Sequence, residues 1–251
     1  SDVCSSDLRF HPLLREFLRS HLVAEVHEAD REEMHRRVAV AAEPIHWPTA
    51  AHHYIEGDRR LDAMRVIGAS SVQALGTGAW GPAMELVERM PEIEPSVAVR
   101  VLRARSLVAR GDPQAAIDIL DVLDLDRLDG HVRALVRLAL ANALNYLDDA
   151  QRLRDLVRAT EHDDTTPPYL RVLAIGWGSL LDSATGAALT TVVDALQELA
   201  TASEAGQLWL YGGLAHHNLA VVQLLRGEPT RAIGHARKAI RSEEHTSELQ
   251  S

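Results

Sequence analysis

Histidine is the residue type in this chain whose placement suggests chemistry, because imidazole binds metals and transfers protons near neutral pH. In the run His52-His53-Tyr54-Ile55-Glu56, a histidine and a glutamate lie one turn apart, as metal ligands on one helix face do. Helical carboxylate sites for metals need such pairs on several helices, and the sequence contains no second one. In the doublet His216-His217, adjacent side chains diverge. We therefore expect these histidines to cap, pack or face solvent, without a metal.

A catalytic nucleophile is equally unsupported by the residue pattern. Ser179, Asp182 and Ser183 fall close together, but no histidine accompanies them as a nucleophilic triad requires. Cys4 is the only cysteine. No glycine-rich loop of the GxxxxGK[ST] type is present to cradle a phosphate. The sequence predicts no catalytic residue, no cofactor and no enzyme activity for this segment.

The composition of the chain limits the binding partners and the cellular compartment that we expect. The formal net charge is −10, and the arginines are scattered among carboxylates, so we expect no nucleic acid to bind this segment. No apolar run reaches the roughly 18 residues of a membrane span; Arg137, Asn142 and Asp182 interrupt the longest candidates. Lys238 is the single lysine, which suggests GC-rich codons and a bacterial source. We expect a cytoplasmic protein without membrane contact.

These residues must be positioned by helices. From His131 to Leu147, apolar residues recur at steps of three and four, with Arg133 and Arg137 on the other side. Aromatic residues make up only 4% of the chain, and the helix formers Ala, Leu and Arg dominate. Glycine and proline turns divide the sequence into about a dozen helices of ordinary length. The pattern predicts an all-α protein.

One helix-helix turn is written twice, in the segments 110–117 (RGDPQAAI) and 226–233 (RGEPTRAI). In each, glycine suits a left-handed residue after the first helix, the acidic residue caps the second, and proline occupies its first turn. Small and apolar residues follow the same steps around both turns, from Ala104 and from Ala220. A weaker third copy surrounds Gly57. The pattern resembles the tetratricopeptide repeat and implies a superhelix of antiparallel helix pairs; an ordinary bundle turn is the alternative.

The first part of the chain adds a second resemblance. The blocks 9–19 (RFHPLLREFLR), 35–39 (HRRVA), 51–58 (AHHYIEGD) and 86–91 (LVERMP) are similar, in this order, to parts of the LuxR-family, MalT-like regulators. The resemblance spans about residues 9–123. It implies that residues 9–45 end a winged-helix region and form linking helices, and that residues 46–240 form a helical-repeat sensor domain.

The same resemblance implies a function. The segment would be the sensor of an ATP-dependent transcriptional regulator, binding a small-molecule effector, protein or peptide and signalling to ATPase and DNA-binding domains outside this chain. The longer protein would bind DNA and could associate with itself. A stand-alone helical-repeat scaffold that assembles proteins is the alternative.

Effector-binding candidates come from one apolar helix. The segment 207–226 carries apolar residues on almost all sides, which predicts an inner helix buried on several faces. Trp209, His216 and Gln223 fall near one stripe with Ala220, where a concave surface would bind a ligand. We therefore take Trp209, His216 and His217 as candidate effector- or partner-binding residues, with packing as the alternative. Weaker candidates are Trp177 and Tyr169.

The two termini are expected to be foreign to the fold. A stretch of DNA that encodes Ser1–Leu8 has a reverse complement that encodes the segment beginning at Arg241, and it looks like a sequencing adapter. We therefore interpret residues 1–8 and 241–251 as adapter-derived. They should make no core contacts beyond accidental helix extension.

Overall fold

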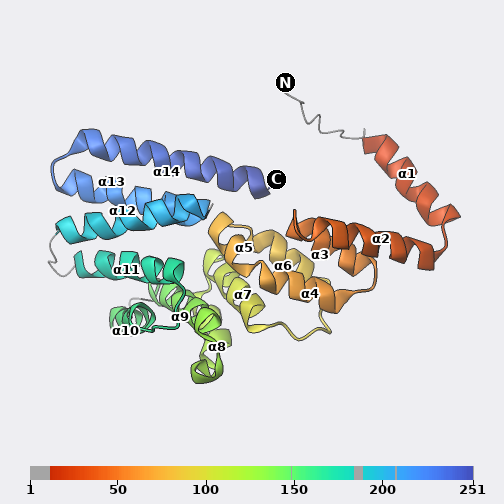
Figure 1. The fold of residues 1–251 in the computed structure, drawn as a ribbon, viewed down its shortest axis with the longest axis horizontal. Coiled ribbons are helices and arrows are strands. Elements are labelled where there is room, and N and C mark those ends of the chain that lie inside the picture. Colours follow the sequence, from red (N-terminus) through yellow and green to blue (C-terminus); the bar gives the residue numbers. More distant parts are fainter. Residues whose placement is uncertain (1–11, 148, 184–188, 207, 251) are drawn as a thin grey trace. The chain divides into compact units, whose positions relative to one another are not determined.

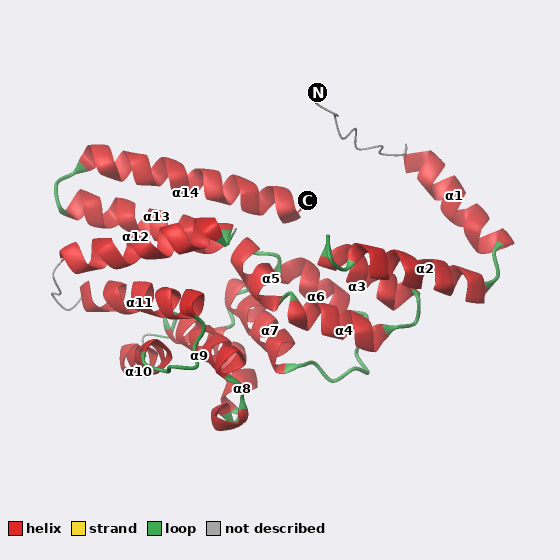
Figure 2. Cartoon of the chain, viewed as in Figure 1, coloured by secondary structure: helices red, strands yellow, loops and turns green. Residues whose placement is uncertain are grey.

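The computed structural model describes residues 12–147, 149–183, 189–206 and 208–250, and these ranges are helical without a strand (Figure 2). The prediction of an all-α protein is confirmed. The elements are α1 (Pro12–Glu25), α2 (Glu28–Ala42), α3 (Trp47–Glu56), α4 (Arg60–Ala69), α5 (Ser71–Thr77), α6 (Trp80–Glu88), α7 (Val97–Ala109), α8 (Pro113–Asp121), a 3-10 turn η1 (Leu125–Arg127), α9 (Gly130–Leu144), α10 (Ala150–Glu161), α11 (Pro168–Ser183), α12 (Leu189–Ala205), α13 (Trp209–Leu225) and α14 (Pro229–Gln250).

The chain divides into two compact units, Ser1–Ala63 and Met64–Ser251. In the first unit, α2 packs on α3 through polar contacts. Tyr54 donates its hydroxyl to Glu43 Oε2 at 2.8 Å, and Arg36 Nε donates to the carbonyl of Gly57 at 3.0 Å. These contacts hold α3 to α2. The first unit ends at Ala63, within α4, and the boundary predicted between residues 45 and 46 stays a prediction.

In the second unit, each helix from α7 to α14 packs on the next, and α7 also packs directly on α9 (Figure 1). The largest fully buried side chains are spread along the unit and not gathered at one centre. They include Ile67, Leu102, Leu120, Val136, Val157, Leu196 and Leu219. The short helix α5 contacts α13, so helices far apart in sequence lie side by side in this unit.

The glycine of the repeated turn has the predicted conformation in both copies. Gly111 and Gly227 have φ of 85° and 75°, the left-handed conformation that favours glycine. The N–H of Asp112 bonds to the carbonyl of Leu107, and the N–H of Glu228 to that of Gln223, both at 2.9 Å. This six-residue closure is the Schellman pattern that satisfies the last carbonyls of a helix. The Asp112 carboxylate also accepts the Ala115 N–H, which confirms its predicted capping role.

The third copy of the turn differs. Gly57 has φ of −90°, and Asp58 takes the left-handed conformation instead, with φ of 54°. The closing bond runs from the Arg59 N–H to the Tyr54 carbonyl, one residue later than in the other copies. Glycine is still favoured at 57, because an added Cβ would lie 3.1 Å from the Glu32 carbonyl oxygen, a tight contact. At this position glycine is favoured by close packing against α2 and not by a left-handed backbone conformation.

Two further expectations concern the terminal segments and the membrane. Residues 1–8 lie outside the described residues, and residues 241–250 continue α14. Ser242 lies beside α13, since a Cβ added to Gly213 would be 3.2 Å from the Cβ of Ser242, a contact consistent with helix extension.

Among the helices described, none is long and apolar enough to cross a membrane.

Candidate binding groove

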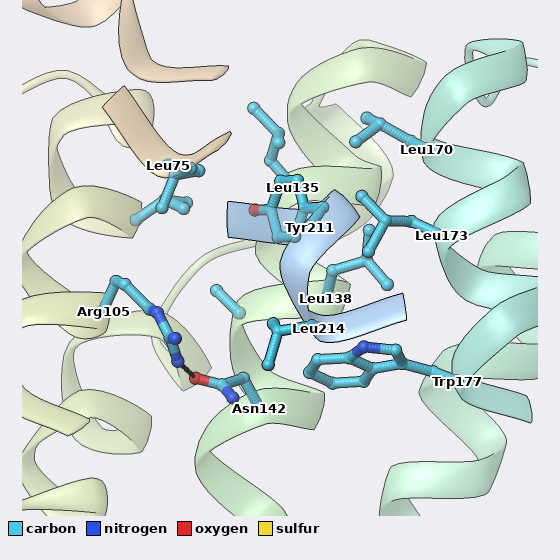
Figure 3. Close-up of a pocket in the computed structure, with 12 residues that line it drawn as sticks. Leu75, Arg105, Leu135, Leu138, Asn142, Leu170, Leu173, Trp177, Tyr211 and Leu214 are labelled. Carbon is cyan, nitrogen blue, oxygen red and sulfur yellow. Dashed lines mark hydrogen bonds between the residues drawn. The ribbon is translucent and has the colours of Figure 1, made fainter. Parts of the chain in front are cut away.

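The second unit carries a groove formed by two hollows that share four residues, Arg105, Asn142, Trp177 and Leu214. Each of these comes from a different helix: α7, α9, α11 and α13. Figure 3 shows Arg105 and Asn142 meeting on one side and the Trp177 indole approaching from the other. The remaining lining residues are Leu75, Val101, Leu135, Leu138, Ala139, Leu170, Leu173 and Tyr211 in the first hollow, and Asn145, Tyr146, Leu153 and Asn218 in the second.

Helical periodicity explains why these side chains share one surface. Residues three, four or seven positions apart lie on the same side of a helix. Leu135, Leu138 and Asn142 follow this spacing on α9, and Leu170, Leu173 and Trp177 repeat it on α11. On α13, the lining residues Tyr211, Leu214 and Asn218 have the same steps. The groove is therefore built from one stripe of each of these helices. Of the helices between and after them, α8, α10, α12 and α14, only α10 contributes a lining residue among those described, Leu153.

The two hollows differ in chemistry. Leucine and valine side chains dominate the first, whereas asparagines and Tyr146 line much of the second. A ligand in the groove would therefore meet an apolar end and a polar end.

Arg105 is the charged group of this groove. Its guanidinium donates a hydrogen bond to Asn142 Oδ1 and lies over the Trp80 ring, 4.9 Å from the ring centroid. Within the described part of the chain, no carboxylate forms an ion pair with it, and no other charged side chain lines either hollow. A half-buried guanidinium is thus held by an amide and an aromatic face, with its positive charge uncompensated.

The predicted candidate His216 lies away from the groove. Its side chain is 5% exposed, Nε2 lies 3.0 Å from Glu204 Oε1, and Nδ1 lies 3.2 Å from Nδ1 of His235. Burial, followed by the charges of His216 and Lys238, lowers the pKa of His235. This histidine pair joins α13 to α14, and Glu204 extends it to α12. The arrangement supports the packing alternative for His216.

Trp209 and His217 also lie outside the groove lining. At about 100° per residue, Trp209, His216 and Gln223 point to roughly the opposite side of α13 from Leu214 and Asn218. His217 is exposed, and Gln223 is buried. The stripe that the sequence assigned to a concave surface is thus mainly a packing stripe. The binding roles of Trp209, His216 and His217 stay predictions.

The expectation that α13 is buried on several faces is wrong for its second half. Val221, Leu224 and Leu225 are exposed, the last to 70%. Nothing in the described chain covers these side chains.

The histidines of the first unit form a cluster without the composition of a metal site. His35 Nδ1 and His53 Nδ1 lie 2.7 Å apart, and His52 meets the His53 ring edge-on. Burial, followed by the charges of His35 and His52, lowers the pKa of His53, while Glu56 opposes the shift. No group of three potential metal ligands gathers in the described residues. His35 of α2 thus adds one imidazole beside the His-Glu spacing seen in the sequence, and it contacts His53 directly.

Other candidates lie outside what the structure describes in side-chain detail. The side chains of Ser179, Asp182 and Ser183, considered as a triad, fall in this part, as does that of Tyr169. Trp177, a weaker candidate, does line the groove.

Arg105 and Asn142 were not recognised as site residues from the sequence. Asn142 was visible as a polar break in an apolar helix stripe, and this is the signal that could have found it. Arg105 carried no such signal, because its role depends on α9 and α6 meeting it in space.

Comparison with known families, curated proteins and solved structures found no match to this chain.

Proposed function

We propose that this chain is the sensor part of a bacterial, signal-responsive transcriptional regulator. Its helix pairs form a tetratricopeptide-like superhelix, and the groove of Arg105, Asn142 and Trp177 binds the effector. ATPase and DNA-binding domains of the longer protein, outside this chain, receive the signal. The proposal combines the order of LuxR-like, MalT-like sequence blocks with a groove suited to a small ligand.

The observation that carries the proposal is the origin of the groove residues. Arg105, Asn142, Trp177 and Leu214 come from α7, α9, α11 and α13, so a single ligand would touch every second helix of the unit. A ligand that binds several helices at once favours one arrangement of them over others. Such differential binding is what a sensor needs in order to change the state of neighbouring domains.

On this proposal the groove binds a ligand and catalyses no reaction. The polar groups that line it are amides, two phenols, an indole and one guanidinium. A guanidinium is not a general base at neutral pH, and the amides cannot act as nucleophiles. The groove is thus suited to binding, and we propose no enzymatic activity for it.

A stand-alone scaffold is the second candidate, and one observation favours it. Val221, Leu224 and Leu225 form an exposed apolar group at the end of α13. Groups of this kind mark protein-protein contacts when they are contiguous. In a scaffold, this surface and not the groove would carry the function.

The uninterrupted genomic locus separates the two candidates. Long-read sequencing across both ends of residues 9–240 should give one open reading frame with a phosphate-loop ATPase before this segment and a helix-turn-helix domain after it. A frame that encodes only this segment, or places unrelated domains around it, would reject the regulator. The same reads test whether residues 1–8 and 241–251 are adapter-derived.

A further inference from the structure

Arg105 is a cation placed where its charge has no partner. Several arginine side chains elsewhere in the described chain pair with carboxylates, as Arg36 does with Glu32 and Arg152 with Asp121, whereas others, such as Arg103, are exposed to water. Arg105 instead lies against Trp80 and Asn142, neither of which carries a charge. Removing a guanidinium from water without an anion costs free energy, and an anionic ligand recovers part of that cost.

The groove also specifies what the anion is attached to. Arg105 and Asn142 lie at the junction of the two hollows, because both residues line both of them. On one side of this junction are Leu75, Leu135, Leu170 and Leu173, and on the other are the asparagines and Tyr146. A ligand with its charge at Arg105 would therefore place an apolar body among the leucines.

Carboxylate is the anion that fits these partners. The planar guanidinium offers paired N–H donors to the two oxygens of a carboxylate, which is a strong, directional interaction. The Asn142 side-chain NH₂ can donate to the same group, because its oxygen already accepts from Arg105. A phosphate would bring a second negative charge, and no second cation lines the groove.

The leucine-lined hollow is bordered by α5 and α13. The helix α5, which provides Leu75, contacts α13. A Cβ added to Gly76 of α5 would lie 2.3 Å from a methyl carbon of Leu208, so these segments touch closely. Leu75 and the α13 residues Tyr211 and Leu214 therefore line one hollow.

We propose that the groove binds a small apolar carboxylic acid, with its carboxylate on Arg105 and Asn142 and its hydrocarbon part beside Leu135, Leu173 and Trp177. The proposal rests on the function proposed above and adds the chemical class of the effector. It concerns aliphatic or arylalkyl acids, whose hydrocarbon part would extend from Arg105 along the leucines that line the first hollow.

Calorimetric titration with matched acids and amides tests this directly. Decanoate and 4-phenylbutyrate, below their aggregation concentrations at pH 7.5, are compared with decanamide and 4-phenylbutanamide. We expect at least one acid to bind about tenfold or more tightly than its amide, as a charge-assisted hydrogen bond implies. Equal affinity of acid and amide would overturn the assignment of the carboxylate.

Two variants locate the interaction. Arg105→Gln removes the cation and should reduce the affinity for the acid about tenfold while leaving that for the amide unchanged. Asn142→Asp keeps Arg105 and its hydrogen bond but places a carboxylate of the protein beside the guanidinium. This internal carboxylate competes with the ligand and should also reduce the affinity for the acid. Because Asn142→Asp preserves the packing around Arg105, it tests the proposal even if Arg105→Gln does not fold.

Arg103→Gln is the matched control. Arg103 is an exposed arginine on the same helix, and it lines a different hollow beside Met90 and Ile93. Its substitution should leave acid binding unchanged. Equal loss with Arg103→Gln and Arg105→Gln would indicate a nonspecific charge effect and reject the site, as would binding of neither acid. Peptides binding where both acids fail would reject it too. None of these results decides the regulator proposal, which the genomic locus tests separately.

Discussion

The Nδ1 atoms of His216 and His235 lie 3.2 Å apart, which joins α13 to α14 through a pair of imidazoles. In such a pair, one nitrogen donates its proton and the other accepts, so the bond cannot persist when both rings are protonated. The pKa of His235 lies below its ordinary value because of burial, then of the charges of His216 and Lys238. Folding therefore favours neutral His235.

This relationship predicts a loss of stability in mild acid. The unfolded chain takes up a proton at His235 near pH 6.5, whereas the folded chain does so only at lower pH. The free energy of unfolding should be highest above about pH 6.5 and fall as the pH decreases through the lowered pKa. His53 contributes in the same direction. Thermal unfolding followed by circular dichroism between pH 8 and pH 5 measures the slope.

A pair of variants assigns this slope. His235→Gln should flatten the pH dependence, because glutamine does not titrate. His27→Gln, at an exposed position before α2, should leave it unchanged. Identical slopes in the parent chain and in His235→Gln would show that the histidine pair does not set the acid sensitivity.

The repeated turn predicts opposite effects of alanine at two glycines of the α13–α14 hairpin. A Cβ at either Gly227 or Gly234 would meet nothing within 4 Å, so packing does not distinguish them. Gly227 has positive φ, and alanine there should destabilise by about 1 kcal/mol. Gly234 lies inside α14, where alanine should stabilise by about 0.5–1 kcal/mol. Urea unfolding of both variants gives the sign, and destabilisation by both would contradict the backbone explanation.

Asp163 should be a strong stability position. Its Oδ2 accepts from Arg133 Nε at 2.9 Å and from Arg137 Nη1 at 2.8 Å, with all three side chains less than a fifth exposed. Hydrogen bonds from Thr165 and Arg133 hold the pKa of Asp163 far below its usual range. Asp163→Asn leaves two cations without their anion and should cost about 2–4 kcal/mol in the free energy of unfolding.

Asp164 provides the comparison for that substitution. It is exposed beside Asp163, and Asp164→Asn should change stability by less than about 0.5 kcal/mol in the same denaturation experiment. The Asp163 contribution should persist above its ordinary pKa and disappear only as the pH falls through the lowered value. If both substitutions lowered the free energy of unfolding by similar amounts near pH 7, Asp163 would not be a special stability position.

The arginine partners argue against binding of DNA by this segment. Arg36, Arg59 and Arg231 pair with Glu32, Asp62 and Glu228. The net charge of the chain is −10, so phosphates would meet repulsion in addition to occupied cations. We expect no sequence-selective DNA retention at low salt and no ATP turnover. A gel shift or a nucleotide assay with a positive result would mean that a functional domain has been misread as repeats.

The sequence was sufficient for the features that depend on neighbours in the chain. The left-handed Gly111 and Gly227, the Asp112 cap and the helices themselves follow from local propensity. The shift of the third turn to Asp58 did not, because close packing of Gly57 on α2 is a tertiary effect. Local rules assign glycine to the turn without distinguishing these two demands.

The orientation of α13 was also harder to predict from the sequence, because it depends on tertiary packing. Its apolar residues surround the helix, so periodicity alone does not say which stripe packs and which faces the groove. Contacts with Glu204 and His235 bury His216, and Tyr211, Leu214 and Asn218 are left to line the groove. The sequence selected the right helix and favoured the stripe on its other side.

Tryptophan fluorescence distinguishes the groove from the packing stripe of α13. Trp177 lines the groove, whereas Trp209 points to the side of α13 that packs. If decanoate binds beside Trp177, its addition should shift the emission of the parent chain and of Trp209→Phe, but much less that of Trp177→Phe. Phenylalanine keeps an apolar ring at each position, so the folds stay comparable. A signal that disappears only in Trp209→Phe would favour the stripe of Trp209 and His216 as the ligand site, and the groove assignment would then be wrong.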